Sequence, residues 1–120
     1  IAADVQKGML EILKKKLQDS ELQKQIQIYH SQEESLGLTG KVDFIFAFYS
    51  FHEMRFIDSI ISELPVIAGP ETKVLISEQK FHVSKTMFDT IIKKMENKGF
   101  EICERLAIFL SRTVVMKIRE

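Results

Sequence analysis

The 120-residue sequence predicts an α/β fold, a three-layer sandwich in which helices cover a mostly parallel sheet that ends in an antiparallel hairpin. Short apolar segments typical of strands alternate along the chain with longer amphipathic segments typical of helices. Residues 42–49 are apolar at almost every position, which indicates a strand buried on both faces. The last two strand-like segments are joined by too few residues for a parallel crossover, so they are expected to pair antiparallel.

The N-terminal third is expected to form one helix and one short strand. Apolar side chains recur at helical spacing between lysines and glutamates, which predicts a helix over residues 4–18 with Asp4 as its N-cap. Residues 24–30 alternate apolar and polar side chains and predict a short strand near the edge of the sheet. A polar loop takes the place of a helix before the strand at 42–49, which is expected to be central.

A second helix is expected over residues 51–64. Ser50 and Glu53 form the S-x-x-E pattern of a capping box. In it the serine side chain accepts a hydrogen bond from an amide of the first turn, and the glutamate side chain accepts one from the serine amide. Pro65 is expected to stop the helix, because proline lacks the amide that continues the hydrogen-bond ladder. A loop carrying "AGPET" then leads to an apolar strand at residues 73–79.

The C-terminal third is expected to form a helix and the antiparallel hairpin. The helix extends over residues 84–98, with one apolar face and Gly99 as its C-terminal stop. The two hairpin strands are expected at residues 100–105 and 109–118. Cys103, the only cysteine, lies in an apolar context where a small buried thiol is the ordinary finding.

Charge and hydropathy limit the classes of partner. The 17 basic and 17 acidic side chains cancel, so no strong overall field attracts nucleic acid or an anionic membrane. The longest apolar run, at residues 44–49, is too short to cross a bilayer. Asp4 and Lys7 interrupt any signal-peptide core. These observations predict one cytoplasmic domain spanning residues 1–120, with no nucleic-acid partner and no membrane partner.

Four stretches of the sequence carry a family pattern: "IAADVQKGMLEILKKKLQ", "VDFIFAFYSFHEM", "KVLISEQKFHVSKTMFD" and "GFEICERLAIFLSRTVVMKI". Together they closely resemble the C-terminal two-thirds of a class I, Rossmann-like methyltransferase that depends on S-adenosylmethionine. The resemblance covers nearly the whole chain. It implies S-adenosylmethionine as cofactor and a small molecule as methyl acceptor. The C-terminal hairpin distinguishes this family from enzymes that bind NAD on a related sheet.

The resemblance implies residues for the adenosine part of the cofactor. Asp4, followed by Val5, corresponds to the acidic residue that holds both ribose hydroxyls, since a carboxylate accepts two hydrogen bonds from a vicinal diol. Gln32 or Glu33 would reach the adenine amino group, with Leu36 against the ring. The same segment also suits a solvated surface loop.

Further residues are implied at the carboxyl ends of the next strands. Ala47 and Phe48 correspond to the motif that lines the methionine part of the cofactor. Tyr49, His52 and His82 are expected beside the acceptor, because ligands of open α/β sheets bind outside the carboxyl ends of the strands. His52 is the candidate catalytic base, because an imidazole can accept a proton near neutrality. The alternative for His52 is a solvated position in a first helical turn, and the histidine spacing matches no compact metal motif.

The chief departure from the family is the absence of its glycine-rich turn, GxGxG, and of the first strand that precedes it. The domain is therefore expected to be N-terminally incomplete, either as a fragment or as a natural remnant. Loss of a middle strand would leave two unpaired edges that favour a homodimer. Two alternatives to a methyltransferase stay open: a non-catalytic dimeric interaction module on a remnant fold, and another α/β nucleotide-binding protein.

Overall fold

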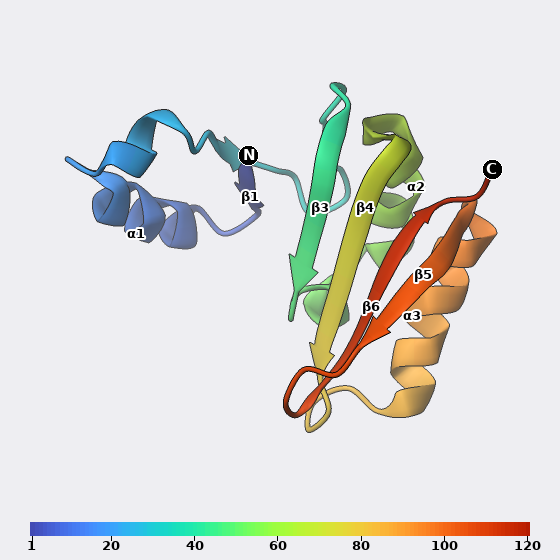
Figure 1. Cartoon of the computed structure of the whole chain (residues 1–120). Helices are drawn as coiled ribbons and strands as arrows, with labels where there is room; N and C mark the ends of the chain where they lie inside the picture. The colour runs from blue at the N-terminus through green and yellow to red at the C-terminus, as the bar shows by residue number, and fades with distance from the viewer.

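The computed structural model describes all 120 residues and contains two separate sheets. The smaller sheet pairs β1 (Ala2–Asp4) with β2 (Ile28–His30) in parallel. The larger sheet has the strand order β3-β4-β6-β5. Its strands are β3 (Val42–Phe48), β4 (Ala68–Gln79), β5 (Phe100–Leu106) and β6 (Ser111–Ile118). Figure 1 shows the smaller sheet apart from the larger one, on the side of β3.

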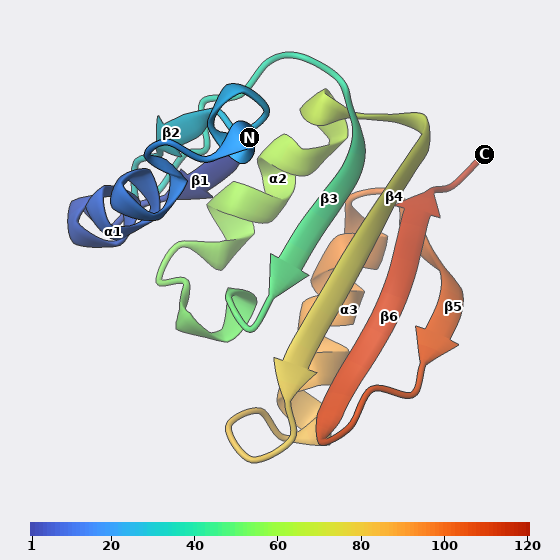
Figure 2. The same ribbon diagram turned by 60° about the vertical axis from the view of Figure 1, so that its left-hand side comes forward.

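Three α-helices accompany the sheets: α1 (Lys7–Leu17), α2 (Ile57–Ile67) and α3 (Lys85–Asn97). Two short 3₁₀ helices are η1 (Glu21–Lys24) and η2 (Phe51–Glu53). Helix α1 lies beside β1 and β2, whereas α2 and α3 lie on one face of the larger sheet (Figure 2). Sixteen buried residues between this face and the two helices form the hydrophobic core. No helix of the chain is both long enough and apolar enough to span a bilayer.

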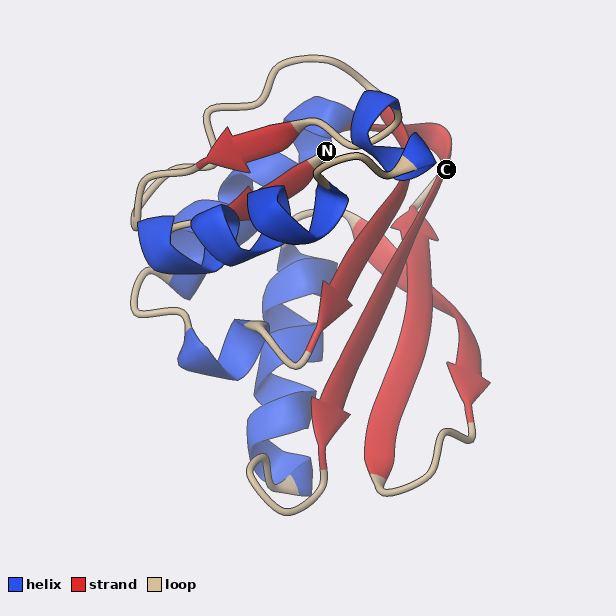
Figure 3. Cartoon of the chain, turned by 90° about the vertical axis from the view of Figure 1, so that its left-hand side faces the viewer, coloured by secondary structure: helices blue, strands red, loops and turns tan.

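The strand directions bring the carboxyl-terminal residues of several strands to one end of the larger sheet. Strands β3 and β4 are parallel and end close together, with Phe48 opposite Ser77. Strand β6 is antiparallel to β4, so its first residues lie beside the last residues of β4. Figure 3 shows this end of the sheet, where the loops after β4 and β5 lie near the start of β6. We call it the carboxyl end of the sheet, the position where open α/β sheets bind their ligands.

The pairings are mixed rather than mostly parallel. The β1–β2 and β3–β4 pairs are parallel, and the β4–β6 and β5–β6 pairs are antiparallel. The predicted C-terminal hairpin is confirmed. The short strand predicted at residues 24–30 is observed only at Ile28–His30, since Glu21–Lys24 forms η1. Its predicted edge position is confirmed, because β2 pairs only with β1. The α/β architecture holds, with no helix between β2 and β3.

The prediction that the strand at residues 42–49 is central and buried on both faces is wrong. Strand β3 forms one edge of the larger sheet. Phe44, Phe46 and Phe48 alternate with core-facing positions and so lie on the face that α2 and α3 leave open, with exposed fractions of 52%, 63% and 42%. Ala47 points the other way into the core. The apolar run is real, but only one of its faces is covered.

Three residues expected to start or stop a helix do not have the predicted role. Helix α1 begins after Gln6 rather than Asp4, which pairs in β1 and accepts a hydrogen bond from the Gln6 amide at 2.9 Å. Ser50 makes no side-chain cap, so the expected capping box with Glu53 does not form. Pro65 lies inside the last turn of α2 instead of stopping the helix. A proline in the last turn removes one hydrogen bond of the helix and leaves its earlier turns intact.

The segment "AGPET" is part of β4 rather than a loop, so this strand begins directly after α2. The pairing of β3 with β4 is irregular there, between Val42 and Phe44. Thr72 supports the irregular part, because its Oγ1 accepts from the Gly69 amide at 2.8 Å and donates to the Val42 carbonyl at 2.5 Å. A side-chain hydroxyl thus replaces ladder bonds at the start of the strand.

The C-terminal third agrees closely with the prediction. Ser84 caps α3 by accepting from the Met87 amide at 3.2 Å, and Gly99 ends it with a φ of 96°. A left-handed backbone at that position favours glycine. Cys103 is exposed rather than buried, because it occupies the irregularity between Ile102 and Glu104 in the β5–β6 pairing.

A carboxylate of α2 connects the two parts of the chain. Oε2 of Glu63 accepts from the amides of Leu36 at 2.9 Å and Gly37 at 3.0 Å. The Ser59 hydroxyl donates to the Glu34 carbonyl at 2.7 Å. Leu36 and Leu38 pack against the core from the same loop. The loop between β2 and β3 is therefore fixed to the outer surface of α2.

Candidate functional site

Strand β3 ends in a sharp turn at the carboxyl end of the sheet. The turn begins at Tyr49, whose φ of 57° lies in the left-handed region. This conformation costs about 1–2 kcal/mol for a residue with a side chain. The Tyr49 amide donates to the Ser77 carbonyl at 2.8 Å, which fixes the turn against β4. Because η2 follows directly, the turn carries His52 to the end of β4.

His52 contacts a fully buried carboxylate on β4. The Nδ1 atom of His52 lies 2.6 Å from Oε2 of Glu78, and the backbone amide of His52 donates to Oε1 at 3.3 Å. The Glu78 side chain is 0% exposed and that of His52 is 18% exposed. Both carboxylate oxygens therefore contact one residue. This arrangement fixes the position of the imidazole ring and leaves its outer nitrogen on the solvent side.

The outer nitrogen of His52 faces other ionisable groups. Oε1 of the exposed Glu53 lies 3.6 Å from Nε2. The ring of His82, which follows β4, lies nearly parallel to that of His52, with centroids 6.5 Å apart. The structure therefore brings the two predicted histidines together. An imidazole that is held through Nδ1 can accept a proton at Nε2, which suits a general base.

Tyr49 lies beside this pair but its hydroxyl is already engaged. Its Oη atom lies 2.6 Å from the Ser111 hydroxyl on β6. Its ring stacks on Phe48, with centroids 3.9 Å apart. A second hydroxyl pair, Ser77 with Thr113, lies one row deeper at 2.8 Å. The Tyr49 side chain is therefore held in one position between Phe48 and β6.

The residues expected near adenosine lie on the smaller sheet and its loop. Asp4 ends β1, where Oδ1 accepts from the Gln6 amide and Oδ2 accepts no hydrogen bond. The Val5 carbonyl contacts Nε2 of His30 at 3.0 Å. Gln32 and Glu33 are exposed directly after β2. A free carboxylate oxygen and exposed polar side chains fit the hydroxyls of a ribose and the edge of a base.

Ala47 and Phe48 point to opposite faces of β3. Ala47 is 5% exposed and belongs to the core, whereas Phe48 is 42% exposed on the open face. Only the backbone of Ala47 is available to a ligand at this face. The two residues expected to line the methionine part of the cofactor therefore do not form one surface.

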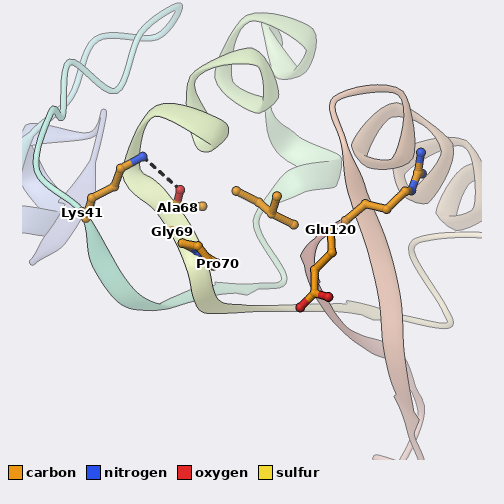
Figure 4. Close-up of a pocket in the computed structure, with 7 residues that line it drawn as sticks. Lys41, Ala68, Gly69, Pro70 and Glu120 are labelled. Atoms are coloured by element: carbon orange, nitrogen blue, oxygen red, sulfur yellow. Dashed lines mark hydrogen bonds between the residues drawn. The ribbon is translucent and has the colours of Figure 1, made fainter.

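A cavity of about 270 Å³ lies at the opposite end of the sheet (Figure 4). It is bordered by the start of β4 and the C-terminal residues, and Lys41 at its rim donates to the Ala68 carbonyl at 3.1 Å. None of the predicted site residues lines it. Groups of three or more His, Cys, Asp or Glu side chains placed to hold a metal ion do not occur in the chain.

No protein-family model and no curated protein matches the chain. Solved structures match its fold. A crystal structure of a SAM dependent methyltransferase from Aquifex aeolicus matches with a TM-score of 0.83 and 23% identity, over 98% of this chain and 67% of that protein. The chain has the fold of S-adenosylmethionine-dependent methyltransferases. The predicted resemblance is thereby confirmed at the level of the fold.

Three further solved structures share this methyltransferase fold. An S-adenosylmethionine-dependent methyltransferase from Clostridium acetobutylicum matches with a TM-score of 0.77 and 9% identity, over 99% of this chain and 74% of that one. An O-methyltransferase from neocarzinostatin biosynthesis was crystallised with S-adenosylmethionine and a naphthoic acid. It matches with a TM-score of 0.72 and 13% identity, over 97% of this chain and 40% of that one. The chain spans 57% of a ribosomal protein L11 methylase from Lactobacillus delbrueckii, at 16% identity and a TM-score of 0.70. It therefore corresponds to part of each of these proteins.

Proposed function

We propose that the chain is a methyltransferase domain that uses S-adenosylmethionine to methylate a small-molecule acceptor. The observation that supports the proposal is the pairing of His52 with the buried Glu78 at the carboxyl end of a methyltransferase fold. Methyl transfer is an in-line displacement, so an enzyme needs orientation above all, and a base where the acceptor must lose a proton.

Each residue has a distinct role in the proposed reaction. Asp4 would hold the ribose hydroxyls of the cofactor through its free Oδ2, and Gln32 or Glu33 would contact the adenine edge. The cofactor supplies a methyl group on a sulfonium sulfur. His52 accepts the acceptor's proton at Nε2, and Glu78 holds the ring through Nδ1. Glu78 is thus a positioning residue.

Calorimetric titration of the full chain with S-adenosylmethionine and with its demethylated product tests the cofactor site. We expect heat and saturation with both, and Asp4→Asn should weaken both affinities about tenfold, the loss expected for a hydrogen bond to a charged acceptor. Asp43→Asn removes an exposed carboxylate of β3 and should leave the affinities unchanged. Absence of binding to both ligands would contradict the proposal for this chain.

A second candidate function, a non-catalytic module that forms a homodimer, is favoured by a different observation. One edge of β3 has no partner strand, and the neighbouring face exposes Phe44, Phe46 and Phe48. An unpaired, apolar edge strand is a template for pairing with another chain. The oligomeric state therefore tests this candidate independently of the cofactor.

A further inference from the structure

The carboxyl end of the sheet holds a second cavity, of about 230 Å³, which none of the roles above uses. It lies between the start of α3, the end of β5 and the start of β6. Four of its lining side chains are cationic and one is a carboxylate: Lys80, Lys85, Arg105, Arg112 and Asp89. We call it the basic pocket. Its positive charge is a local feature, because the whole chain has a formal net charge of zero.

Most of the cations in the basic pocket have no protein partner. Lys85 pairs with Asp89 at 2.7 Å, whereas Lys80, Arg105 and Arg112 form no ion pair. The Nε atom of Arg112 is buried and donates no hydrogen bond. A buried donor without an acceptor costs about 1–3 kcal/mol, so an acceptor brought by a ligand would be stabilising. Cations of the basic pocket lower the pKa of Asp89. The hydrogen bond from Lys85 is the largest cause, and the positive charges of Lys85, Arg105 and Arg112 add to it.

The basic pocket lies next to the His52–Glu78 pair. Arg112 is directly opposite Glu78 in the β4–β6 pairing, so their Cα atoms are neighbours across one strand spacing of about 5 Å. Ser111, which contacts the Tyr49 hydroxyl, also lines the pocket. A molecule with its reacting group at His52 could therefore place another group in the pocket.

We propose that the basic pocket binds the phosphoryl group of a small-molecule phosphate ester. Arginine guanidinium groups match a phosphate oxygen pair in shape and charge, and the first turn of α3 adds the positive end of a helix dipole. Pockets that enclose a whole ligand measure roughly 300–1,000 Å³, so a cavity of 230 Å³ fits one group of a larger molecule. That this molecule is the methyl acceptor rests on the proposed function.

Titration of the full chain with inorganic phosphate, followed by amide NMR shifts, tests the pocket without any methyl transfer. We expect saturable shifts at residues of the pocket. Arg112→Met and Arg105→Gln should each weaken binding about tenfold, the effect of one charge-assisted hydrogen bond. Asp89→Asn should tighten binding about threefold, since it removes the only carboxylate and frees Lys85.

Lys93→Met is the matched control, because Lys93 is an exposed lysine of α3 outside the pocket. It should leave the phosphate affinity unchanged. Arg105 is exposed at an edge strand, so its variant tests the pocket even where Arg112→Met unfolds. A phosphate affinity that stays unchanged in the Arg112, Arg105 and Asp89 variants, or no saturable binding at all, would overturn the proposal.

Competition identifies the source of the phosphoryl group. Glycerol phosphate should displace inorganic phosphate, whereas glycerol should not. Stronger displacement by an oligonucleotide, or by vesicles of anionic lipid, would instead assign the pocket to a nucleic acid or a membrane and overturn the small-molecule proposal. Failure of S-adenosylmethionine to bind in the calorimetric titration would contradict the proposed function alone and leave the phosphate result standing.

Discussion

At the scale of single residues, the contact between His52 and Glu78 determines which ring nitrogen carries a proton. An ionised carboxylate can only accept hydrogen bonds, so Nδ1 must be the donor across the 2.6 Å contact. We expect the neutral His52 ring to be the Nδ1–H tautomer, with the lone pair of Nε2 directed outward. Nitrogen-15 chemical shifts of the ring measure the tautomer directly. An Nε2–H tautomer would contradict the proposed base.

A pair of glutamate variants separates the two carboxylates near this ring. Glu78→Gln introduces an amide that can donate to Nδ1, so the tautomer should shift toward Nε2–H. The free energy of unfolding should fall by about 1–3 kcal/mol, since a buried charge-assisted bond is lost. Glu53→Gln changes only an exposed group 3.6 Å from Nε2 and should alter neither quantity. Equal effects of both variants would show that burial of Glu78 has no special role.

The sequence predicted His52 but not its partner. Glu78 alternates with Val74 and Ile76 in one strand, so its side chain belongs to the row that faces the core. A carboxylate in a core-facing row indicates a paired, functional group, so the sequence did contain a signal for Glu78. The partner lies 26 residues earlier in the chain, and spacing alone does not predict the turn at Tyr49 that brings it there.

At the scale of elements, Glu63 of α2 fixes the loop between β2 and β3. We expect Glu63→Ala to lower the free energy of unfolding by about 1–3 kcal/mol, because the amides of Leu36 and Gly37 lose a charged acceptor. Denaturant unfolding measures the change. Glu96→Ala is the matched control, because Glu96 is an exposed glutamate of α3 whose side chain makes no hydrogen bond, and the substitution makes the same change in helix propensity. An equal loss in both variants would contradict the role of Glu63.

Elements with local signals were predicted well. The side-chain cap at Ser84 and the left-handed Gly99 define α3 within the sequence itself. The hairpin of β5 and β6 followed from the short connection alone. The start of β4 was missed, because "AGPET" contains the residues of a turn and its strand conformation depends on pairing with β3. The burial of β3 was overestimated for the same reason, since the cover of a strand is decided by distant elements.

At the scale of the whole molecule, the two sheets leave unpaired edges and an open apolar face. Phe44, Phe46 and Phe48 together make an exposed row on β3. Full burial of one such side chain contributes about 1.5–3 kcal/mol. A second copy that pairs along β3 around a two-fold axis would continue the larger sheet and place the two rows side by side.

We therefore expect the chain to form dimers as its concentration increases, and Phe46→Lys to shift the population to monomers. Phe46 lies near the middle of β3 and is 63% exposed, so lysine there leaves the fold intact and opposes edge pairing by its charge. Light scattering coupled to size-exclusion chromatography measures the mass. Phe81→Lys, at a loop residue that is 78% exposed, should dimerise like the wild type. A wild-type chain that stays monomeric at all concentrations would contradict the homodimer, whereas dimers that survive Phe46→Lys would place the interface away from β3.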